Sequence, residues 1–249
     1  MTHAFSSFFA ILLTLHWGLG FPGNGKPPVG NAPAEHLRQF DAVYMGDPEE
    51  KTVYLTFDAG YENGNMQKIL DTLQSKDVKA AFFVVGHYVE ASPDMIRRMA
   101  AEGHIIANHT KRHPDMSKIT DPAAFRKELD SLDEMVKQVT GAGISRYYRP
   151  PSGKYSDGNL KMAQKAGYKT VFWSLAYVDW LENRQPAREQ ALRKLTGRIH
   201  PGAILLLHST SSTNAEILGE LIDQYRAMGY SFGTLDELFA KSPTPPPAR

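Results

Sequence analysis

The strongest constraint on the fold is an alternation of short apolar runs with longer amphipathic segments between residues 51 and 240. Continuous apolar runs are typical of strands buried on both faces, and the amphipathic segments between them are typical of covering helices. About seven such pairs predict a parallel sheet wrapped in helices, either a barrel or a doubly wound sheet. The chain has no G-x-G-x-x-G or Walker motif, so the nucleotide-binding form of the doubly wound sheet loses its main support.

The predicted elements follow one another closely and define a single domain, residues 51–240. Strands are expected at 52–57, 80–85, 104–107, 146–148, 170–174, 203–207 and 230–232. Helices are expected at 65–75, 93–102, 122–139, 156–166, 186–195, 215–228 and 235–239. Asp121 precedes the longest helical segment, where its carboxylate can cap the first free backbone N–H groups.

The two ends of the chain differ from this domain in composition. Residues 1–21 contain an apolar run, 8–15, that suggests a signal peptide or an N-terminal membrane anchor, and the alternative is a buried or interfacial helix. Residues 22–50 are expected to be a linker and N-terminal extension, because 22–33 is rich in Gly, Pro and Asn. Residues 241–249 read as a disordered Pro-rich tail. We therefore expect an exported, monomeric protein that is located in the cell wall or associated with a membrane.

The overall composition excludes several classes of function. Lysine and arginine total 28 and acidic residues total 27, so neither a nucleic acid nor an anionic membrane is expected as the main partner. The chain has no cysteine, which excludes disulfides, thiolate zinc sites and cysteine nucleophiles. Any metal site therefore has to use other ligands.

Polar side chains follow six consecutive predicted strands. They are Asp58, His87, Asn108 with His109, Arg149, Asp179 and His208. In a parallel α/β barrel the carboxyl ends of the strands open on one face, which is where active sites of such barrels lie. His104 and His200 instead precede their strands, so we assign them no functional role. His87 has no spacing partner, and we leave it open between a structural residue and a substrate contact.

The spacing of His109 and His113 suits a pair of metal ligands. An H-x-x-x-H sequence puts two imidazoles on one face where the loop turns helically, and the alternative is two exposed loop histidines beside Pro114. Asp58 could be a ligand or a general base next to such a metal. Its alternative is an ordinary turn aspartate at the end of a strand.

Three further residues could complete a hydrolytic site. His208 follows five apolar residues and could act as an acid, with Asp179 as the carboxylate that orients and charges it. Arg149 could hold Asp58 ionised through a bidentate pair, or it is an ordinary surface arginine. The Pro-Pro-Ser-Gly sequence after Arg149 would form a rigid loop whose backbone N–H groups could face a developing oxyanion.

Five short motifs occur in the order seen in one known family. They are T-F-D ending at Asp58, H-T-x-x-H from His109 to His113, R-P-P-x-G from Arg149, D-W at Asp179 and Trp180, and L-L-H-S around His208. In order and spacing, residues 51–240 resemble the polysaccharide deacetylases with the NodB-type domain. The resemblance implies a distorted (β/α)7 barrel with its active site at the C-terminal ends of the strands, in agreement with the strand pattern.

The resemblance also implies a reaction, the metal-dependent hydrolysis of an N-acetyl group on a sugar polymer. By this resemblance, His109 and His113 bind a divalent metal ion, which could be zinc or another. Asp58 would activate the attacking water. The metal and a backbone N–H group near residues 148–152 would stabilise the tetrahedral oxyanion.

The remaining roles follow from the same resemblance. His208 would protonate the departing amine under the influence of Asp179, and Arg149 would position the base. The substrate contacts that the resemblance implies are Trp180, which would wall the sugar groove, Tyr148 and Pro151.

The chain departs from most of the family at one position. Most members have a second aspartate directly after the base, as the third metal ligand, whereas this chain has Ala59. Alanine cannot bind a metal. Either two histidines hold the ion together with water or substrate oxygens, or another group takes over, with Glu62 and Asn63 as candidates.

The departure points to one subgroup. The stretches D-x-G-Y-E-N-G and F-W-S-L-A-Y-V-D-W resemble peptidoglycan deacetylases that act on N-acetylmuramic acid before closure of the muramic δ-lactam in spore cortex. The anionic lactyl ether of muramic acid would be tolerated better without an extra carboxylate at the metal. Peptidoglycan glycan strands would then be the partner and the forespore envelope the location. The alternatives are a deacetylase of N-acetylglucosamine polymers, such as chitin oligomers, and a catalytically inactive glycan-binding barrel.

Overall fold

The computed structural model describes residues 32–241. The expected signal peptide or anchor, residues 1–21, lies outside the described residues, as do 22–31 of the expected linker and 242–249 of the Pro-rich tail. Between residues 32 and 241, no helix has the length and apolar character needed to cross a bilayer.

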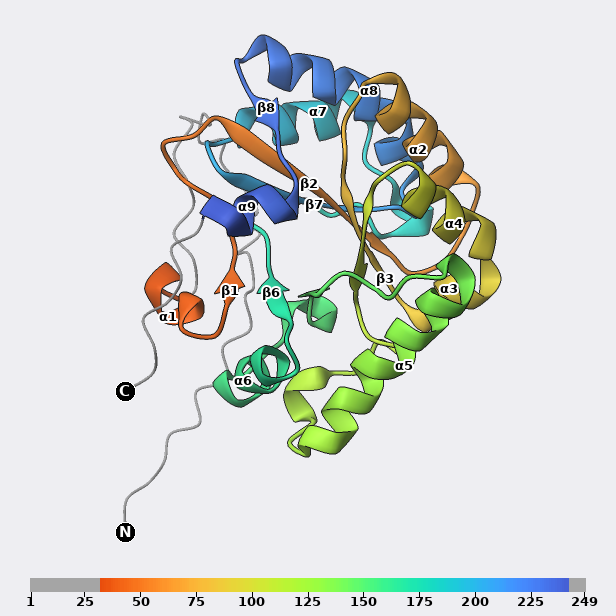
Figure 1. Ribbon diagram of the computed structural model, residues 1–249. Coiled ribbons are helices and arrows are strands. Elements are labelled where there is room, and N and C mark those ends of the chain that lie inside the picture. Colours follow the sequence, from red (N-terminus) through yellow and green to blue (C-terminus); the bar gives the residue numbers. More distant parts are fainter. Residues whose placement is uncertain (1–31, 242–249) are drawn as a thin grey trace.

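The described residues form one curled sheet in the strand order β1-β6-β5-β4-β3-β2-β7, with β8 paired to β2 (Figure 1). The strands are β1 (Ala42–Val43), β2 (Thr52–Ala59), β3 (Ala81–Val84), β4 (Ile105–Asn108), β5 (Tyr147–Tyr148), β6 (Lys169–Val171), β7 (Ala203–His208) and β8 (Ser231–Phe232). All pairs are parallel. Single bridges, Met45 to Ala203 and Leu175 to Leu205, connect the segments after β1 and β6 to β7 at the other end of the sheet. The expected distorted (β/α)7 barrel is thereby confirmed, in an incompletely closed form.

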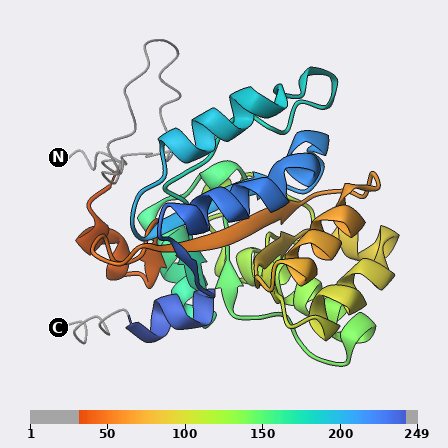
Figure 2. The same ribbon diagram turned by 90° about the horizontal axis from the view of Figure 1, so that it is seen from above.

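Helices surround the sheet on its outer side (Figures 1 and 2). They are α1 (Ala34–Arg38), α2 (Asn65–Ser75), α3 (Gly86–Ala91), α4 (Pro93–Ala101), α5 (Pro122–Thr140), α6 (Asp157–Lys165), α7 (Arg188–Gly197), α8 (Ser212–Ala227) and α9 (Leu235–Lys241). Helix α8 packs between α2 and α7. The last helix, α9, instead covers the N-terminal end of the strands, where Leu235 and Leu238 pack with Tyr54 and Ile204.

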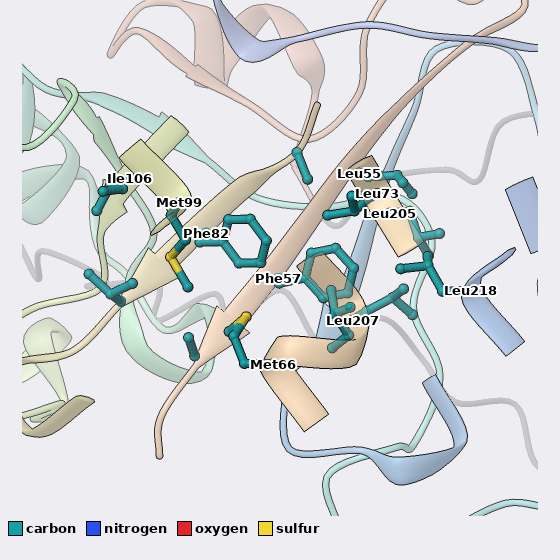
Figure 3. Packing of buried hydrophobic residues seen from close by; sticks show 14 of the residues in the cluster. Leu55, Phe57, Met66, Leu73, Phe82, Met99, Ile106, Leu205, Leu207 and Leu218 are labelled. Carbon is teal, nitrogen blue, oxygen red and sulfur yellow. The ribbon is translucent and has the colours of Figure 1, made fainter. Parts of the chain in front are cut away.

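The outer face of the sheet carries the main hydrophobic core. The rings of Phe57 in β2 and Phe82 in β3 stack with centroids 5.3 Å apart and an interplanar angle of 16°. In Figure 3, side chains from β7 and the covering helices surround this pair, among them Leu205, Leu207, Met66, Leu73, Met99 and Leu218. Each buried large apolar side chain contributes about 1.5–3 kcal/mol, so this layer holds the helices on the barrel.

The inner face of the sheet carries the polar residues of the site. Side chains alternate along a strand, so Tyr54, Thr56 and Asp58 of β2 all face the inside of the barrel. Tyr54 packs against the residues of α9 at the N-terminal end. Thr56 and Asp58 lie further along the strand, toward the end where active sites of parallel barrels occur. At the opposite end of the barrel, Tyr54 and the apolar residues of α9 pack together.

The structure corrects two expectations from the sequence. Strand β2 continues to Ala59, so Asp58 lies inside the strand and not after it. Residues 34–50 of the expected linker belong to the fold, because β1 pairs with β6 through Ala42 opposite Thr170. The two residues of β1 are too few to give a periodic pattern, and their pairing depends on a strand far along the chain.

The contact between this N-terminal segment and β7 generates a stability prediction. Gly202 has φ +73°, and a Cβ there would lie 2.6 Å from the carbonyl oxygen of Asp47 and 2.7 Å from the carbonyl carbon of Gly46. Its N–H donates to the carbonyl oxygen of Glu50 at 2.9 Å. Gly202→Ala should lower the free energy of unfolding by about 3 kcal/mol, through backbone strain and the clash.

Gly167→Ala is the matched control, because Gly167 has φ +81° but no atom within 4 Å of the added Cβ. It should cost only about 1–2 kcal/mol from the left-handed backbone. Denaturant unfolding of both variants measures the difference. Equal losses would show that the segment before β2 does not pack closely against the start of β7.

Candidate active site

A fully buried arginine directly after β5 organises the site. The Arg149 side chain is 0% exposed, and its Nη1 donates to Oδ1 of Asp58 at 2.7 Å. Its Nη2 donates to Oγ1 of Thr56 at 2.9 Å. Nε donates to the carbonyl oxygen of Val171 at 3.0 Å, and Nη2 to that of Phe172 at 3.2 Å. One guanidinium therefore ties β2 to β6 across the barrel. The structure brings Arg149 and Asp58 together as the sequence predicts, but through a single hydrogen bond and not the expected bidentate pair, because Nη2 is bonded to Thr56.

Asp58 and His208 are neighbours across the sheet. They are partners in the parallel register of β2 and β7. Nε2 of His109 lies 3.5 Å from Oδ2 of Asp58. Burial alone would raise the pKa of Asp58, but electrostatic interactions with His109, Arg149 and His208 and the hydrogen bond from Arg149 outweigh it, and the pKa lies below its ordinary value. Asp58 is thus an ionised carboxylate beside two imidazoles.

His208 is oriented by a buried carboxylate. Its Nδ1 lies 2.7 Å from Oδ1 of Asp179, and its backbone N–H donates to Oδ2 at 2.8 Å. Asn214 Nδ2 donates to the same Oδ2 at 2.6 Å and fixes the carboxylate. Burial lowers the pKa of His208, but the hydrogen bond and charge of Asp179 and the charge of Asp58 outweigh it, and the pKa is raised. His208 therefore carries its proton on Nδ1 and holds a second one on Nε2 to a higher pH than a free histidine.

The rings of His109 and His113 pack edge to face, with centroids 4.9 Å apart and an interplanar angle of 69°. Nδ1 of His109 lies 2.8 Å from the carbonyl oxygen of Arg149, so this nitrogen carries the hydrogen and Nε2 keeps its lone pair. Burial lowers the pKa of His109 to about 4, and burial also lowers the pKa of His113. Both rings are neutral at neutral pH, the form that binds a metal.

These two imidazoles fit a divalent cation, but the protein offers no third ligand nearby. Within residues 32–241, no set of three or more His, Cys, Asp or Glu side chains is arranged to hold a metal ion. Ala59 is fully buried and belongs to the outer hydrophobic core, so its side chain does not face the histidines. The donor set therefore suits an ion that completes its coordination with water or substrate oxygens.

Glu62 and Asn63 brace the loop after β2 instead of facing the histidines. Glu62 accepts hydrogen bonds from the Tyr88 hydroxyl at 3.0 Å and from the Gly64 N–H at 2.6 Å. Asn63 Nδ2 donates to the carbonyl oxygen of Thr210 at 2.8 Å. Both side chains are committed to fixing this loop, and the geometry gives no support to either of them as the replacement ligand.

The three expected substrate contacts differ in accessibility. Trp180 is 47% exposed, and its ring lies 5.5 Å from that of His208, where it can wall a groove. Tyr148 is 1% exposed and packs edge-on against Phe125, so the expectation of a substrate contact through its side chain is wrong. Tyr148 lies in a strand buried on both faces. Pro151 is also buried and shapes the loop after Arg149.

Backbone strain concentrates in two loops of the site. Among the described residues, five that are not glycine have positive φ, and three of these are Thr110 at 72°, His113 at 55° and Ser152 at 56°. Such conformations cost about 1–3 kcal/mol each and persist where the surroundings enforce them, often at functional sites. The histidine loop and the loop after Arg149 are therefore held in fixed shapes.

The other histidines lie away from this cluster. His104 accepts a hydrogen bond from the Ala80 N–H at 3.3 Å, and Nδ1 of His200 lies 2.8 Å from the carbonyl oxygen of Pro201. Both precede their strands, at the opposite end of the barrel. His87 is exposed on α3, and its role stays open between structure and substrate contact.

The sequence analysis missed three residues that support the site, Thr56, Asn214 and Glu128. Thr56 could have been found, because it lies two residues before Asp58 and so shares its face of the strand. Asn214 reaches Asp179 from the first turn of α8. Glu128 accepts a hydrogen bond from a backbone N–H of the histidine loop and comes from α5. No local pattern marks the last two.

The chain was compared with families of known proteins, and the region that matches one of them contains Asp58, His109, His113 and Arg149. The family model described as polysaccharide deacetylase matches residues 45–171. The chain belongs to the polysaccharide deacetylase family. It is a family 4 carbohydrate esterase, a class of hydrolases whose deacetylases are generally metal-dependent.

Several relatives of this deacetylase are known. PdaA of Bacillus subtilis, a peptidoglycan-N-acetylmuramic acid deacetylase, is 44% identical over 225 residues, which is 90% of this chain and 85% of that protein. Its solved structure aligns with a TM-score of 0.84 and 43% identity, covering 91% of this chain and 97% of that one. A peptidoglycan-N-acetylglucosamine deacetylase of Bacillus cereus is 30% identical, covering 84% of this chain and 76% of that protein. A family 4 pseudoenzyme from Bacillus anthracis aligns with a TM-score of 0.73 and 30% identity, over 79% of this chain and 68% of that one.

The His208–Asp179 pair generates a pH prediction. Asp179→Asn removes the charge that raises the pKa of His208, while burial of the ring continues to lower it. The His208 pKa should fall below that of the wild type, and the imidazolium should be lost at a lower pH. NMR titration of the His208 ring carbons measures this directly. An unchanged pKa would show that Asp179 does not control the charge of His208.

Proposed function

We propose that this protein hydrolyses the N-acetyl group of N-acetylmuramic acid in peptidoglycan glycan strands. The observation that carries the proposal is the pairing of an ionised carboxylate, Asp58, with a histidine of raised pKa, His208, at adjacent positions of β2 and β7. A base and an acid side by side are what hydrolysis of an amide needs. The 44% identity with the N-acetylmuramic acid deacetylase PdaA supports the choice of substrate.

The proposed reaction uses these two residues in turn. Asp58 accepts a proton from the water whose oxygen attacks the acetyl carbonyl carbon. His208 donates its Nε2 proton to the sugar nitrogen as the C–N bond breaks, and the products are acetate and a free amine. Asp179 keeps the His208 ring oriented and protonated through its bond to Nδ1. Arg149 keeps the base in place and ionised.

We propose that His109 and His113 would hold a divalent cation. Such a cation would supply Lewis acidity, polarising the acetyl carbonyl and lowering the pKa of the attacking water. The Nδ1–H bond of His109 to the Arg149 carbonyl oxygen fixes the ring so that Nε2 faces the site. The base and one metal ligand are thus oriented by the side chain and the backbone of the same arginine.

The loop after Arg149 supplies one candidate donor for the oxyanion. Pro150 and Pro151 have no N–H, and the Arg149 N–H already donates to the carbonyl oxygen of Asn108 at 2.9 Å. The Ser152 N–H has no acceptor among residues 32–241. Ser152 is also held at a φ of 56°, which sets the direction of this N–H. We assign the stabilisation of the developing negative charge to it.

Ala59 and Trp180 support the choice of an acidic sugar. With alanine in place of the usual aspartate, the cation site carries one negative charge less, which favours a substrate with its own carboxylate. N-acetylmuramic acid has such a group in its lactyl ether. The exposed ring of Trp180 beside His208 provides an apolar surface on which a sugar ring can stack.

The biological setting belongs to the same proposal. Deacetylation of muramic acid would precede closure of the muramic δ-lactam in spore cortex, and the enzyme would then be exported as a monomer to the cell wall or forespore envelope, cleaved or anchored at its N-terminus. The resemblance of the D-x-G-Y-E-N-G stretch to the sporulation subgroup is what supports this setting.

The substrate can be tested by acetate release. Glycan strands of peptidoglycan stripped of their stem peptides, and N-acetylglucosamine oligomers, are incubated in parallel with the protein and a divalent metal. We expect acetate from the glycan strands only. Acetate mainly from the oligomers would make the protein a deacetylase of N-acetylglucosamine polymers, like its relative from Bacillus cereus.

Asp58→Asn is the control that separates an enzyme from a glycan-binding barrel. It keeps the shape of the side chain but removes the base, so turnover should fall by about 10²–10⁴-fold while binding of the glycan persists. Absence of acetate from either substrate with the wild-type protein would bring the binding role forward. That outcome has a precedent in the pseudoenzyme relative from Bacillus anthracis.

A further inference from the structure

The loop that carries both histidines adopts a backbone conformation that it would not adopt by itself. Thr110 has φ 72° and His113 has φ 55°. Positive φ is unfavourable for a residue with a Cβ and is a genuine outlier for a β-branched one such as threonine. The spacing of the two imidazoles therefore depends on contacts that hold this loop in place.

Part of the support comes from within the loop. The Thr110 N–H donates to Oδ1 of Asn108 at 2.9 Å, and the His113 N–H donates to Oγ1 of Thr110 at 3.0 Å. The carbonyl oxygen of Lys111 accepts from the Gly86 N–H at 2.9 Å. These bonds leave the backbone N–H groups of Lys111 and Arg112, in the middle of the loop, to be bound from outside it.

Glu128 of α5 binds both of these N–H groups. Its backbone carbonyl oxygen accepts from the Lys111 N–H at 3.1 Å, and its Oε2 accepts from the Arg112 N–H at 3.0 Å. Oε1 accepts from Nε of Arg112 at 2.7 Å. The side chain of Glu128 is 3% exposed, whereas that of Arg112 is 74% exposed. The carboxylate is thus buried under the loop, and the arginine covers it from the solvent side.

Glu128 lies on the buried face of α5, where a carboxylate is unusual. The buried residues of α5 are Phe125, Glu128, Leu129, Leu132 and Val136, so Glu128 is the charged member of an otherwise apolar face. Burying a carboxylate costs free energy unless hydrogen bonds compensate for it. Here the compensation comes from the backbone N–H and the guanidinium of the residue directly before His113.

We propose that Glu128 is a positioning residue that sets the spacing of His109 and His113 and so the affinity of the protein for a divalent cation. The inference rests on the proposed function, in which these two histidines hold the ion. Among residues 32–241 no third ligand accompanies the two imidazoles, so affinity depends on how well they are arranged in advance. Glu128 touches neither the ion nor the substrate and acts through the loop.

The test is the dissociation constant of Co²⁺, which binds the ligands that Zn²⁺ binds and reports its coordination by visible absorption. Glu128→Gln keeps the size of the side chain but loses the negative charge that faces the backbone N–H and the guanidinium of Arg112. We expect Co²⁺ to bind about 10–100-fold more weakly, the usual effect of removing an outer contact of a metal ligand. The absorption of the saturated variant should also differ from that of the wild type.

Asp133→Asn is the matched control on the same helix. Asp133 accepts from the Ile144 N–H at 2.7 Å and pairs with Arg146 at 3.1 Å, so it makes the same kind of contact to a loop without histidines. Its variant should lose comparable stability but bind Co²⁺ within about twofold of the wild type, because its loop carries no ligand. If both variants weaken binding equally, the effect of Glu128 is general destabilisation and the proposal is overturned.

Arg112→Ala keeps the test available if Glu128→Gln does not fold. This variant removes the guanidinium from Glu128 but keeps the bond from the backbone N–H of residue 112 to Oε2, so it should weaken Co²⁺ binding less than Glu128→Gln does, by about threefold. Unchanged affinity in the variants, with the wild type binding Co²⁺, would overturn the role of Glu128 alone. A wild-type protein that binds no divalent cation would overturn the proposed metal site and the role of Glu128 with it.

Discussion

The site depends on one buried guanidinium. Arg149 lies inside the barrel with Asp58 and Thr56 of β2 on one side and the carbonyl oxygens of Val171 and Phe172 on the other. Burying an unpaired charge would cost several kcal/mol, so this arginine is tolerable only with these partners in place. Its position in turn fixes the base, and its backbone carbonyl oxygen fixes the ring of His109.

The rest of the site follows from the periodicity and register of the sheet. Alternation along β2 puts Asp58 on the inner face, and the parallel register puts His208 beside it. The charges around them push the two pKa values in opposite directions, down for the carboxyl and up for the imidazole. The side chain of Ala59 points to the outer core, so the residues proposed to hold a cation are two neutral imidazoles on a strained loop. Hydrogen bonds to Arg149 and Asp179 therefore fix Asp58 and His208 in place. The proposed cation would have coordination positions left for water or substrate oxygens.

Much of this arrangement could be predicted from the sequence, because it depends on local patterns. The helix at 65–75 was placed at the bounds that α2 has, and the pairs Arg149–Asp58 and His208–Asp179 were expected from strand ends alone. The contacts of Asn214 with Asp179 and of Glu128 with the histidine loop could not be predicted. Both residues come from helices whose rotation about their axes depends on tertiary packing. The expectation for Tyr148 failed because a side chain next to Arg149 can still point into the hydrophobic core. The short strand β1 was missed because its pairing is entirely long-range.

The most direct measurement is the free energy of unfolding of the variant Arg149→Met. Methionine fills a similar volume but supplies none of the donors, so the Asp58 carboxylate would lose its buried partner and β6 its link to β2. The variant should lose about 3–5 kcal/mol, the cost of breaking a buried ion pair by removing one side. A loss below about 1 kcal/mol, the size of an exposed ion pair, would contradict the view that this guanidinium organises the site.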